Sequence, residues 1–465
     1  MNLQPRLHQA PPDQKELPEN SDPRPLPLHQ NRLNTLHPLR PLRPLKLQPT
    51  QAIQAIQPIK PTEATKPIQP AAIIPLAPTR RKSHDLLLHL MSQRKVEFLW
   101  VNTPQALDFF VTNLRGYFPI ALDTEADSLH HYRESVCLIQ VTHDSRHFLI
   151  DPLSAFPLDE LWPPTSRHTW ILHGADFDLR MLRRAGAPEP QAVFDTMLAA
   201  QLLGLKAFGY GALVEQFCGI TLNKGSQKAD WSRRPLSQTM IDYAVQDTEY
   251  LEPIADALGA QLDDKGRRAW HEQSCARVVE SSKSIRQDDP ENDWRISGSA
   301  LLSPQALAIV RELWLWREKE AEAVDLPVFK VLHNELLLDL ASWSAANPRV
   351  SPMGAPRWPQ RSSPARAERL IEAIERGRHA PPVPRPPRGV RPPRDKDAEV
   401  RMEKLRVHRD KIAADLAIDP TVIAPKSTLQ EVSRQPDEAP ARLIAEHRWC
   451  PWQWELLKPV ITTVE

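Results

Sequence analysis

Glycine and cysteine are both scarce in this sequence. Glycine accounts for 14 of the 465 residues, about half of its usual share. The four cysteines stand far apart, and none of them belongs to a CxxC pair: Cys137, Cys218, Cys275 and Cys450. This spacing argues against a zinc site or a disulfide framework and fits a reducing cytosol, so we expect a cytoplasmic protein.

Long apolar runs and an excess of one kind of charge are missing too. No run of about 18 apolar residues occurs, so we expect no membrane span. Residues 1–30 are polar and proline-rich, without the apolar segment of a secretory signal. The formal net charge is +1, so any basic surface that binds nucleic acid must be local.

Proline, in contrast, is abundant. The 48 prolines crowd most densely into residues 1–80 and 380–394. Aromatic residues are absent from the first of these segments and apolar periodicity is poor there, so we predict a disordered, partly polyproline II tail over residues 1–90. Met91 is a candidate for the true start of the chain, because it is the first methionine after Met1 and ordered-looking sequence begins just beyond it.

The pattern of residues 95–265 predicts one α/β domain. Strands are expected at 118–125, 135–142, 146–151 and 169–173. Helices are expected at 176–185, 196–204, 209–217 and 237–262. Three strands in succession, followed by alternating helix and strand, indicate a mixed sheet flanked by helices.

Beyond residue 295 the pattern becomes helical. We predict a helical module at 295–378, a basic proline-rich linker at 379–398 and a second helical module at 399–465. The segment "WREKEAEAVDLPVFKVL" resembles the later segment "HRDKIAADLAIDPTVIA", which indicates a duplicated module. The most basic stretch outside the tail runs from Arg376 to Lys411. We therefore expect these modules to hold the body of a folded nucleic acid, the alternative being a merely solvated linker.

Two carboxylates interrupt the apolar segment "FPIALDTEADSL". Alternate side chains of a strand share a face, so Asp123 and Glu125 point the same way. Two such charges repel each other and raise each other's pKa unless a cation lies between them. A plain strand end or helix cap would account for these two acids but not for the ones that follow.

Two further acids lie on apolar faces of predicted helices. Asp178 shares its face with Met181 and Leu182, and Asp247 shares its face with Tyr243, one turn earlier. A buried, unpaired carboxylate costs several kcal/mol, and no Lys or Arg stands at matching spacings. Divalent cations account for all four acids, and oxygen ligands favour Mg²⁺ or Mn²⁺ over zinc. Two such ions about 4 Å apart form a clamp for attack on a phosphodiester.

The segments "DTE", "HGADFDL" and "YAVQD" resemble the three exonuclease motifs of the DEDD superfamily, in its tyrosine-bearing subgroup. Residues 226–251 are similar to the corresponding block of the ribonuclease D family, and the helical part resembles the helicase-and-ribonuclease-D C-terminal (HRDC) domain, in two copies. The order and spacing of the motifs make this resemblance specific. It covers most of residues 95–465 and none of the tail.

The resemblance implies a ribonuclease H-like fold. Four acids would hold two divalent metal ions, Mg²⁺ or Mn²⁺: Asp123, Glu125, Asp178 and Asp247. Tyr243 would position the attacking water and help to deprotonate it, whereas its structural alternative is a core tyrosine with a hydrogen-bonded hydroxyl. The substrate would be the 3′ end of RNA, with tRNA precursors as the expected partner, shortened with release of nucleoside 5′-monophosphates.

Other residues near the motifs carry weaker signals. Five residues of one loop are candidates for contacts with phosphates or bases: Lys224, Gln227, Lys228, Trp231 and Arg234. The alternative is a solvated loop packed on its tryptophan. We interpret His173 as a structural residue that orients the following turn, and Asp195 as a helix cap. A preference for DNA and a catalytically silent RNA-binding protein are the rival functions.

Overall fold

The computed structural model describes residues 97–462, apart from 115, 117, 223–224, 285–288, 361 and 386–393. The tail predicted for residues 1–90, Met91 and the middle of the predicted linker lie outside the described residues. Among the described residues, no helix combines the length and the apolar composition needed to cross a membrane.

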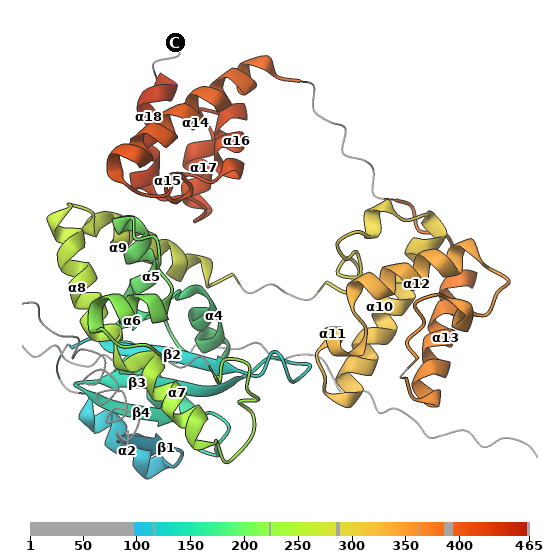
Figure 1. Ribbon diagram of the computed structural model, residues 1–465, viewed down its shortest axis with the longest axis horizontal. Coiled ribbons are helices and arrows are strands. Elements are labelled where there is room, and N and C mark those ends of the chain that lie inside the picture. The colour runs from blue at the N-terminus through green and yellow to red at the C-terminus, as the bar shows by residue number, and fades with distance from the viewer. Residues whose placement is uncertain are drawn as a thin grey trace, which may run out of the picture. The chain divides into compact units, whose positions relative to one another are not determined.

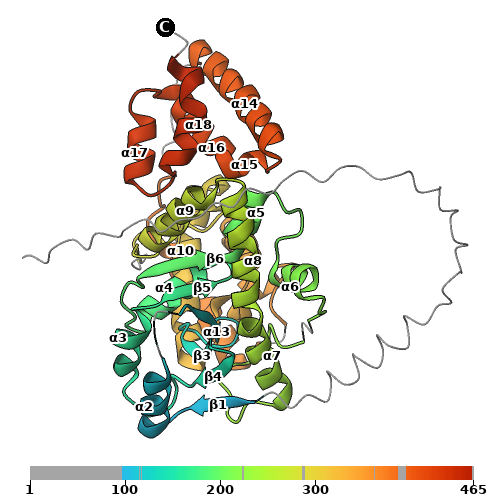
Figure 2. The same cartoon turned by 90° about the vertical axis from the view of Figure 1, so that its left-hand side faces the viewer.

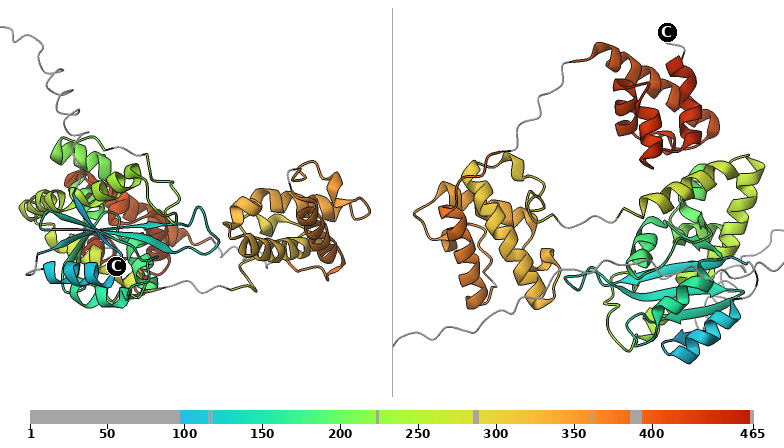
Figure 3. Two further views of the ribbon diagram at one scale, coloured as in Figure 1. Left: turned by 90° about the horizontal axis from the view of Figure 1, so that it is seen from below. Right: turned by 180° about the vertical axis from the view of Figure 1, so that it is seen from behind.

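A mixed sheet of six strands organises the first domain (Figure 1). The strands are β1 (Phe98–Val101), β2 (Ile120–Ala126), β3 (Val136–His143), β4 (Arg146–Ile150), β5 (Thr169–Leu172) and β6 (Ala192–Asp195). Their order is β1-β4-β3-β2-β5-β6, with β2 antiparallel to β3 and parallel to β5. The strands fan out in the left-hand view of Figure 3, as the twist of a sheet requires. The predicted mixed sheet is confirmed, and two short edge strands, β1 and β6, join it.

Eight helices are described in this domain (Figure 2). They are α2 (Pro104–Asn113), α3 (Trp162–Thr165), α4 (Asp176–Arg184), α5 (Thr196–Leu203), α6 (Tyr210–Cys218), α7 (Gln238–Glu249), α8 (Leu251–Asp264) and α9 (Arg268–Ser281). The single helix predicted at 237–262 is wrong, because α7 ends and α8 begins at Tyr250. Pro253 explains this break, since it has no N–H to donate to the carbonyl of Glu249 and its ring crowds that carbonyl.

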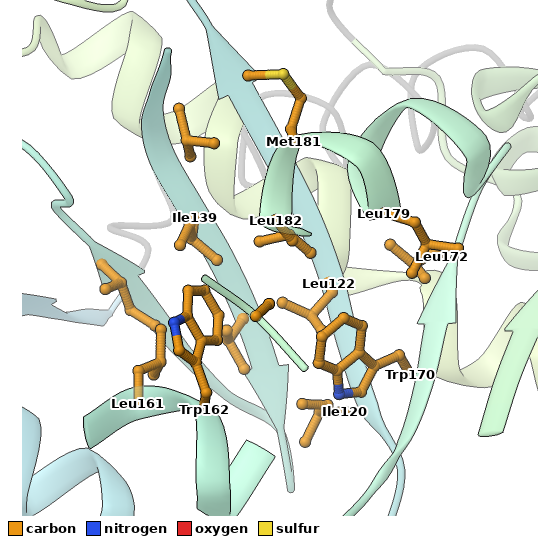
Figure 4. Packing of buried hydrophobic residues seen from close by; sticks show 14 of the residues in the cluster. Ile120, Leu122, Ile139, Leu161, Trp162, Trp170, Leu172, Leu179, Met181 and Leu182 are labelled. Carbon is orange, nitrogen blue, oxygen red and sulfur yellow. The ribbon is translucent and has the colours of Figure 1, made fainter. Parts of the chain in front are cut away.

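The two faces of the sheet are covered by different helices. On one face, the apolar side chains of β2 and β3 pack against α4 and Trp162 (Figure 4). On the other face, α8 covers the centre of the sheet through Leu251 and Ala255, while α7 packs along β3 through Ala244 and Val245. Because side chains alternate along a strand, Leu122 enters the first core and Asp123 faces α7.

The remaining described helices form two groups, each with its own apolar core. The first group contains α10 (Pro304–Val324), α11 (Val328–Val331), α12 (Asn334–Ala346) and α13 (Pro364–His379). The second group contains α14 (Lys396–Leu416), α15 (Pro420–Ile423), α16 (Lys426–Arg434), α17 (Ala439–Ala445) and α18 (Pro451–Thr462).

The two groups begin alike. Each opens with a helix of 21 residues that ends at a left-handed residue, Asp325 in one and Ala417 in the other, and a four-residue helix follows. In both, an arginine of the long helix donates to a carbonyl fifteen residues further on, from Arg317 to Leu332 and from Arg409 to Ala424. These shared bonds favour the interpretation of a duplicated module.

Candidate active site

Strand β2 carries the first pair of acids in its second half. Asp123 lies opposite Gln140 of β3, and Glu125 lies opposite Leu138. The register between β2 and β3 shifts just after Glu125, so the regular pairing of the strand ends where its carboxylates emerge. The alternation of the strand therefore places both acids on one face, as predicted from the sequence. The structure shows that α7 covers this face.

Helix α7 supplies the third acid. Ser237 caps this helix by accepting a hydrogen bond from Met240 N–H, and the helix packs on β2 and β3. Carboxylate oxygens of Asp123, Glu125 and Asp247 all lie within 4.8 Å of one another. Three acids from two distant segments thus share one small volume.

Asp178 approaches from the opposite face of the sheet. It lies in the first turn of α4, and its Oδ1 accepts two hydrogen bonds from Thr124, from the backbone N–H at 3.1 Å and from Oγ1 at 2.6 Å. It is buried, with 6% of its surface exposed. Asp178 therefore stands beside the other three acids, tied to the residue between Asp123 and Glu125, and is not a member of the close group.

The turn before α4 is fixed by Asp195. Its carboxylate accepts hydrogen bonds from the N–H groups of Gly174 and Ala175, at 3.0 and 2.9 Å. The same carboxylate accepts from Met197 and Leu198 and so caps α5, as predicted. One buried acid thus sets the start of two helices, including the helix that carries Asp178.

Burial raises the pKa of all four acids, and the charges of neighbouring acids add to the effect. Burial is the largest cause of the raised pKa of Asp123, followed by the charges of Asp178, Asp247 and Glu125. Burial likewise raises the pKa of Glu125 to about 9, that of Asp247 to about 7 and that of Asp178 to about 6. No Lys or Arg of the described chain forms an ion pair with these four acids.

The donor set fits a divalent cation. All the converging ligands are carboxylate oxygens, the donors that Mg²⁺ and Mn²⁺ prefer. In addition, Oδ2 of Asp247 is buried without a hydrogen-bond partner in the described structure. An anionic oxygen in that position is strongly destabilised by burial, and a bound cation would compensate it.

Two hollows adjoin the carboxylates. Four residues line both of them: Asp123, His173, Gln227 and Tyr243. Leu129 and Phe177 line one hollow and are each 42% exposed, which is unusual for large apolar side chains beside a charged centre. Such exposed apolar surface next to the acids suits the faces of nucleic-acid bases.

The loop predicted to contact substrate divides into two parts. Gln227 lines both hollows and Lys228 lines one of them, whereas Lys224 lies outside the described residues. Trp231 is 1% exposed and packs in the core near Tyr243. Arg234 forms a bidentate ion pair with Asp151. Trp231 and Arg234 therefore hold the loop in place, whereas Gln227 and Lys228 face the hollows.

Tyr243 lies one turn before Asp247, and its hydroxyl interacts with that carboxylate. Burial, and then the charge of Asp247, raise the pKa of Tyr243 well above its usual range. The phenol therefore stays protonated at neutral pH and acts as a hydrogen-bond donor.

Tyr210, His173 and Gln140 also lie at the site, although the sequence does not single out the first or the third. Tyr210 lines one hollow, and its hydroxyl donates to the carbonyl of Gln246 at 2.7 Å. Gln140 is fully buried opposite Asp123, and neither atom of its amide has a hydrogen-bond partner in the described structure. The only sequence signal for His173 is its place at the start of the segment that contains Asp178.

The raised pKa values predict that metal stabilises the protein more at high pH. Carboxylates with raised pKa keep protons in the folded state that the unfolded state releases, so stability without metal falls as the pH rises through about 6 to 9. Metal binds the ionised carboxylates and relieves their repulsion. We expect the difference in unfolding free energy between buffers with Mn²⁺ and with EDTA to grow by on the order of 2 kcal/mol over this window. Chemical denaturation at several pH values measures it, and a difference that does not depend on pH would contradict the cluster.

Comparison with known proteins agrees with this geometry. A 3′-5′ exonuclease family model matches residues 98–263, and an HRDC domain model matches residues 306–348. The fold is thus that of the 3′-5′ exonuclease class, and the acidic cluster lies within the matched domain. Ribonuclease D of Jannaschia sp. (strain CCS1) is 33% identical over 273 residues, which cover 56% of this chain and 69% of that protein. The chain belongs to the ribonuclease D family.

The share of a relative that the chain covers varies. Ribonuclease D of Zymomonas mobilis subsp. mobilis is 34% identical over 227 residues, or 48% of this chain, and the chain spans 58% of that relative. The crystal structure of Escherichia coli RNase D superposes with a TM-score of 0.59 at 22% identity, covering 79% of this chain and 98% of that one. This second likeness concerns the fold.

Proposed function

We propose that this protein is a metal-dependent 3′→5′ exoribonuclease that removes nucleoside 5′-monophosphates from RNA ends. The observation that carries the proposal is the convergence of Asp123, Glu125 and Asp247 within 4.8 Å, although no Lys or Arg of the described residues forms an ion pair with them. Membership of the ribonuclease D family, and the names of the relatives, support RNA as the substrate. Precursors of tRNA are the RNA class that we propose.

The proposed roles follow from the contacts of each residue. Asp123, Glu125 and Asp247 would hold divalent ions, with Asp178 next to them. Two bound Mg²⁺ or Mn²⁺ ions would supply charge stabilisation at the scissile phosphate and a water of lowered pKa. Tyr243, which stays protonated, would orient the attacking water by hydrogen bonding rather than remove its proton. Gln227 and Lys228 would contact the nucleotides in the hollows.

A nuclease assay tests the proposal and separates its rivals. The protein is incubated with 5′-labelled RNA and DNA of equal sequence, in Mn²⁺ and in EDTA. We expect RNA to shorten one nucleotide at a time with Mn²⁺, and no cleavage in EDTA. Faster cleavage of DNA would favour the DNA exonuclease, and binding without cleavage would favour the silent RNA-binding protein.

Binding of long RNA needs basic side chains that are free of acidic partners. Five arginines of the basic stretch pair with acids of the same helical groups: Arg376, Arg378, Arg394, Arg406 and Arg409. Lys404 and Lys411 of α14 are exposed and form no ion pair within the described part of the chain. We propose that these two lysines contribute phosphate contacts for a folded RNA.

Replacing Lys404 and Lys411 with alanine is expected to weaken binding of a tRNA-sized RNA. Each lost phosphate contact lowers the slope of log affinity against log salt by close to one unit, so the double variant should lose about two. The rate on a short single strand should not change, because the chemical step is untouched. The matched control replaces Lys319 and Lys330 of the first helical group with alanine. These lysines are also exposed, and the control removes the same net charge. Equal losses in both double variants would show a general charge effect and contradict the assignment.

A further inference from the structure

His173 stands at the junction of the two hollows. It directly follows β5, and it lines both hollows together with Asp123 and Tyr243. Its ring packs against that of Tyr210, with the ring centres 5.6 Å apart. A nucleotide on either side of the scissile phosphate would therefore come within reach of this imidazole.

The neighbouring hydrogen bonds assign the tautomer of His173. Oγ1 of Thr196 lies 3.0 Å from the carbonyl oxygen of Leu172 and donates its only proton to it. Nδ1 of His173 lies 2.9 Å from the same Oγ1. Because that hydroxyl proton is already engaged, Nδ1 must donate its own proton to Oγ1. Thr196 is fully buried, so this arrangement is firmly held, and the lone pair of the ring lies on Nε2.

Nε2 of His173 has no hydrogen-bond partner among the described residues, and it is not fully buried. It therefore opens into a hollow. Burial lowers the pKa of His173, with the charge of Asp195 opposing the effect, so the ring is neutral at pH 7 and Nε2 is available as an acceptor. The nitrogen does not belong to the group of ligand atoms formed by the three acids.

A lone acceptor in this position calls for a donor on the substrate. The sugar of RNA offers a 2′-hydroxyl beside each phosphodiester, and DNA has no donor there. We propose that Nε2 of His173 accepts a hydrogen bond from the 2′-hydroxyl of one of the two nucleotides that flank the scissile bond, and that this contact selects RNA over DNA. The inference rests on the proposed function and assigns a specificity residue to its site.

Two substitutions separate the acceptor from the rest of the ring. In His173→Asn, the amide nitrogen can replace Nδ1 as the donor to Thr196, but no acceptor remains in the place of Nε2. In His173→Gln, the longer side chain can return an amide oxygen to that place. The first variant should lose the recognition of the 2′-hydroxyl, and the second should recover part of it.

The substrates are short RNAs with a single 2′-fluoro nucleotide, at the last or the next-to-last position. Fluorine is similar in size to the 2′-hydroxyl but cannot donate a hydrogen bond. For the wild-type protein we expect kcat/KM to fall about 10-fold at one of these positions, the effect of leaving one polar group unpaired. The 2′-fluoro penalty should be about 5-fold smaller in His173→Asn than in the wild-type protein, and fluorine's intrinsic effect on the reaction cancels when the two penalties are divided. His173→Gln should show an intermediate penalty.

Three outcomes would overturn the proposal while leaving the exoribonuclease function intact. The first is an equal 2′-fluoro penalty in the wild-type protein and His173→Asn. The second is that His173→Asn changes the penalty for a terminal 3′-deoxy nucleotide and not the penalty for the 2′-fluoro nucleotides. The third is a loss of Mn²⁺ affinity in His173→Asn, measured by calorimetry, which would make the imidazole a metal ligand. Failure of the proposed function itself would instead appear as absent cleavage of unmodified RNA by the wild-type protein.

Discussion

Asp247→Asn is expected to lower the rate of RNA cleavage roughly 10³-fold or more, the scale of losing a central catalytic group. The substitution keeps the shape of the side chain and removes one anionic ligand from the group that it forms with Asp123 and Glu125. RNA binding should stay close to the wild-type level, because the substitution keeps the shape of the site and adds no charge that repels the RNA backbone. Single-turnover kinetics with Mn²⁺ measure the rate, and filter binding in Ca²⁺ measures the affinity.

The same variant has a second signature that does not depend on activity. Removing one charge from a repelling cluster should raise the melting temperature in EDTA at pH 8, while the stabilisation by Mn²⁺ should shrink. Asp256→Asn in α8 is the matched control, because this exposed acid lies outside the cluster and the substitution removes the same charge. Cleavage at the wild-type rate by Asp247→Asn would end the metal assignment.

Tyr243→Phe is expected to slow cleavage by roughly 10²–10⁴-fold, the range for a group that positions or activates the attacking water. The loss should fall on kcat, with KM and Mn²⁺ affinity preserved, because the ring still packs beside Trp231 and the carboxylates are unchanged.

The pH dependence of this variant distinguishes the two possible roles of its hydroxyl. The raised pKa of Tyr243 keeps the phenol protonated, so the pH profile of the residual activity should have the same shape as that of the wild-type protein. Loss of an alkaline limb would make the tyrosine a base. An unchanged kcat would return it to a core tyrosine.

Regular periodicity explains the parts of the site that the sequence predicts. Strand alternation places Asp123 and Glu125 together, and a helical stripe places Asp247 on a buried face, because both patterns depend on local geometry alone. The bond from Thr124 to Asp178 joins residues 54 positions apart, and no local pattern encodes it. Sequence alone could therefore name the fourth acid but not its separate position.

The loop before α7 shows a different limit. Its composition is that of a nucleic-acid contact, yet Arg234 is drawn toward Asp151 at the end of β4, an acid that no local pattern connects with it. The orientation of each loop side chain depends on such tertiary partners. The edge strands β1 and β6 were not predicted for a related reason, since they are held by pairing with β4 and β5, which no local pattern encodes.

The double role of Asp195 gives the two sides of the site a common origin. The turn before α4, the helix that carries Asp178, is hydrogen-bonded to the carboxylate of Asp195. His173 is hydrogen-bonded to Thr196, the residue after Asp195. The positions of Asp178 and His173 thus both depend on the first turn of α5, a helix that contributes no side chain to the carboxylate cluster. A displacement of α5 would therefore act on both of them through these bonds. Substitutions in the packing of this remote helix would therefore act as a single adjustment on catalysis and substrate choice together, and the two properties should vary in step when that packing is altered.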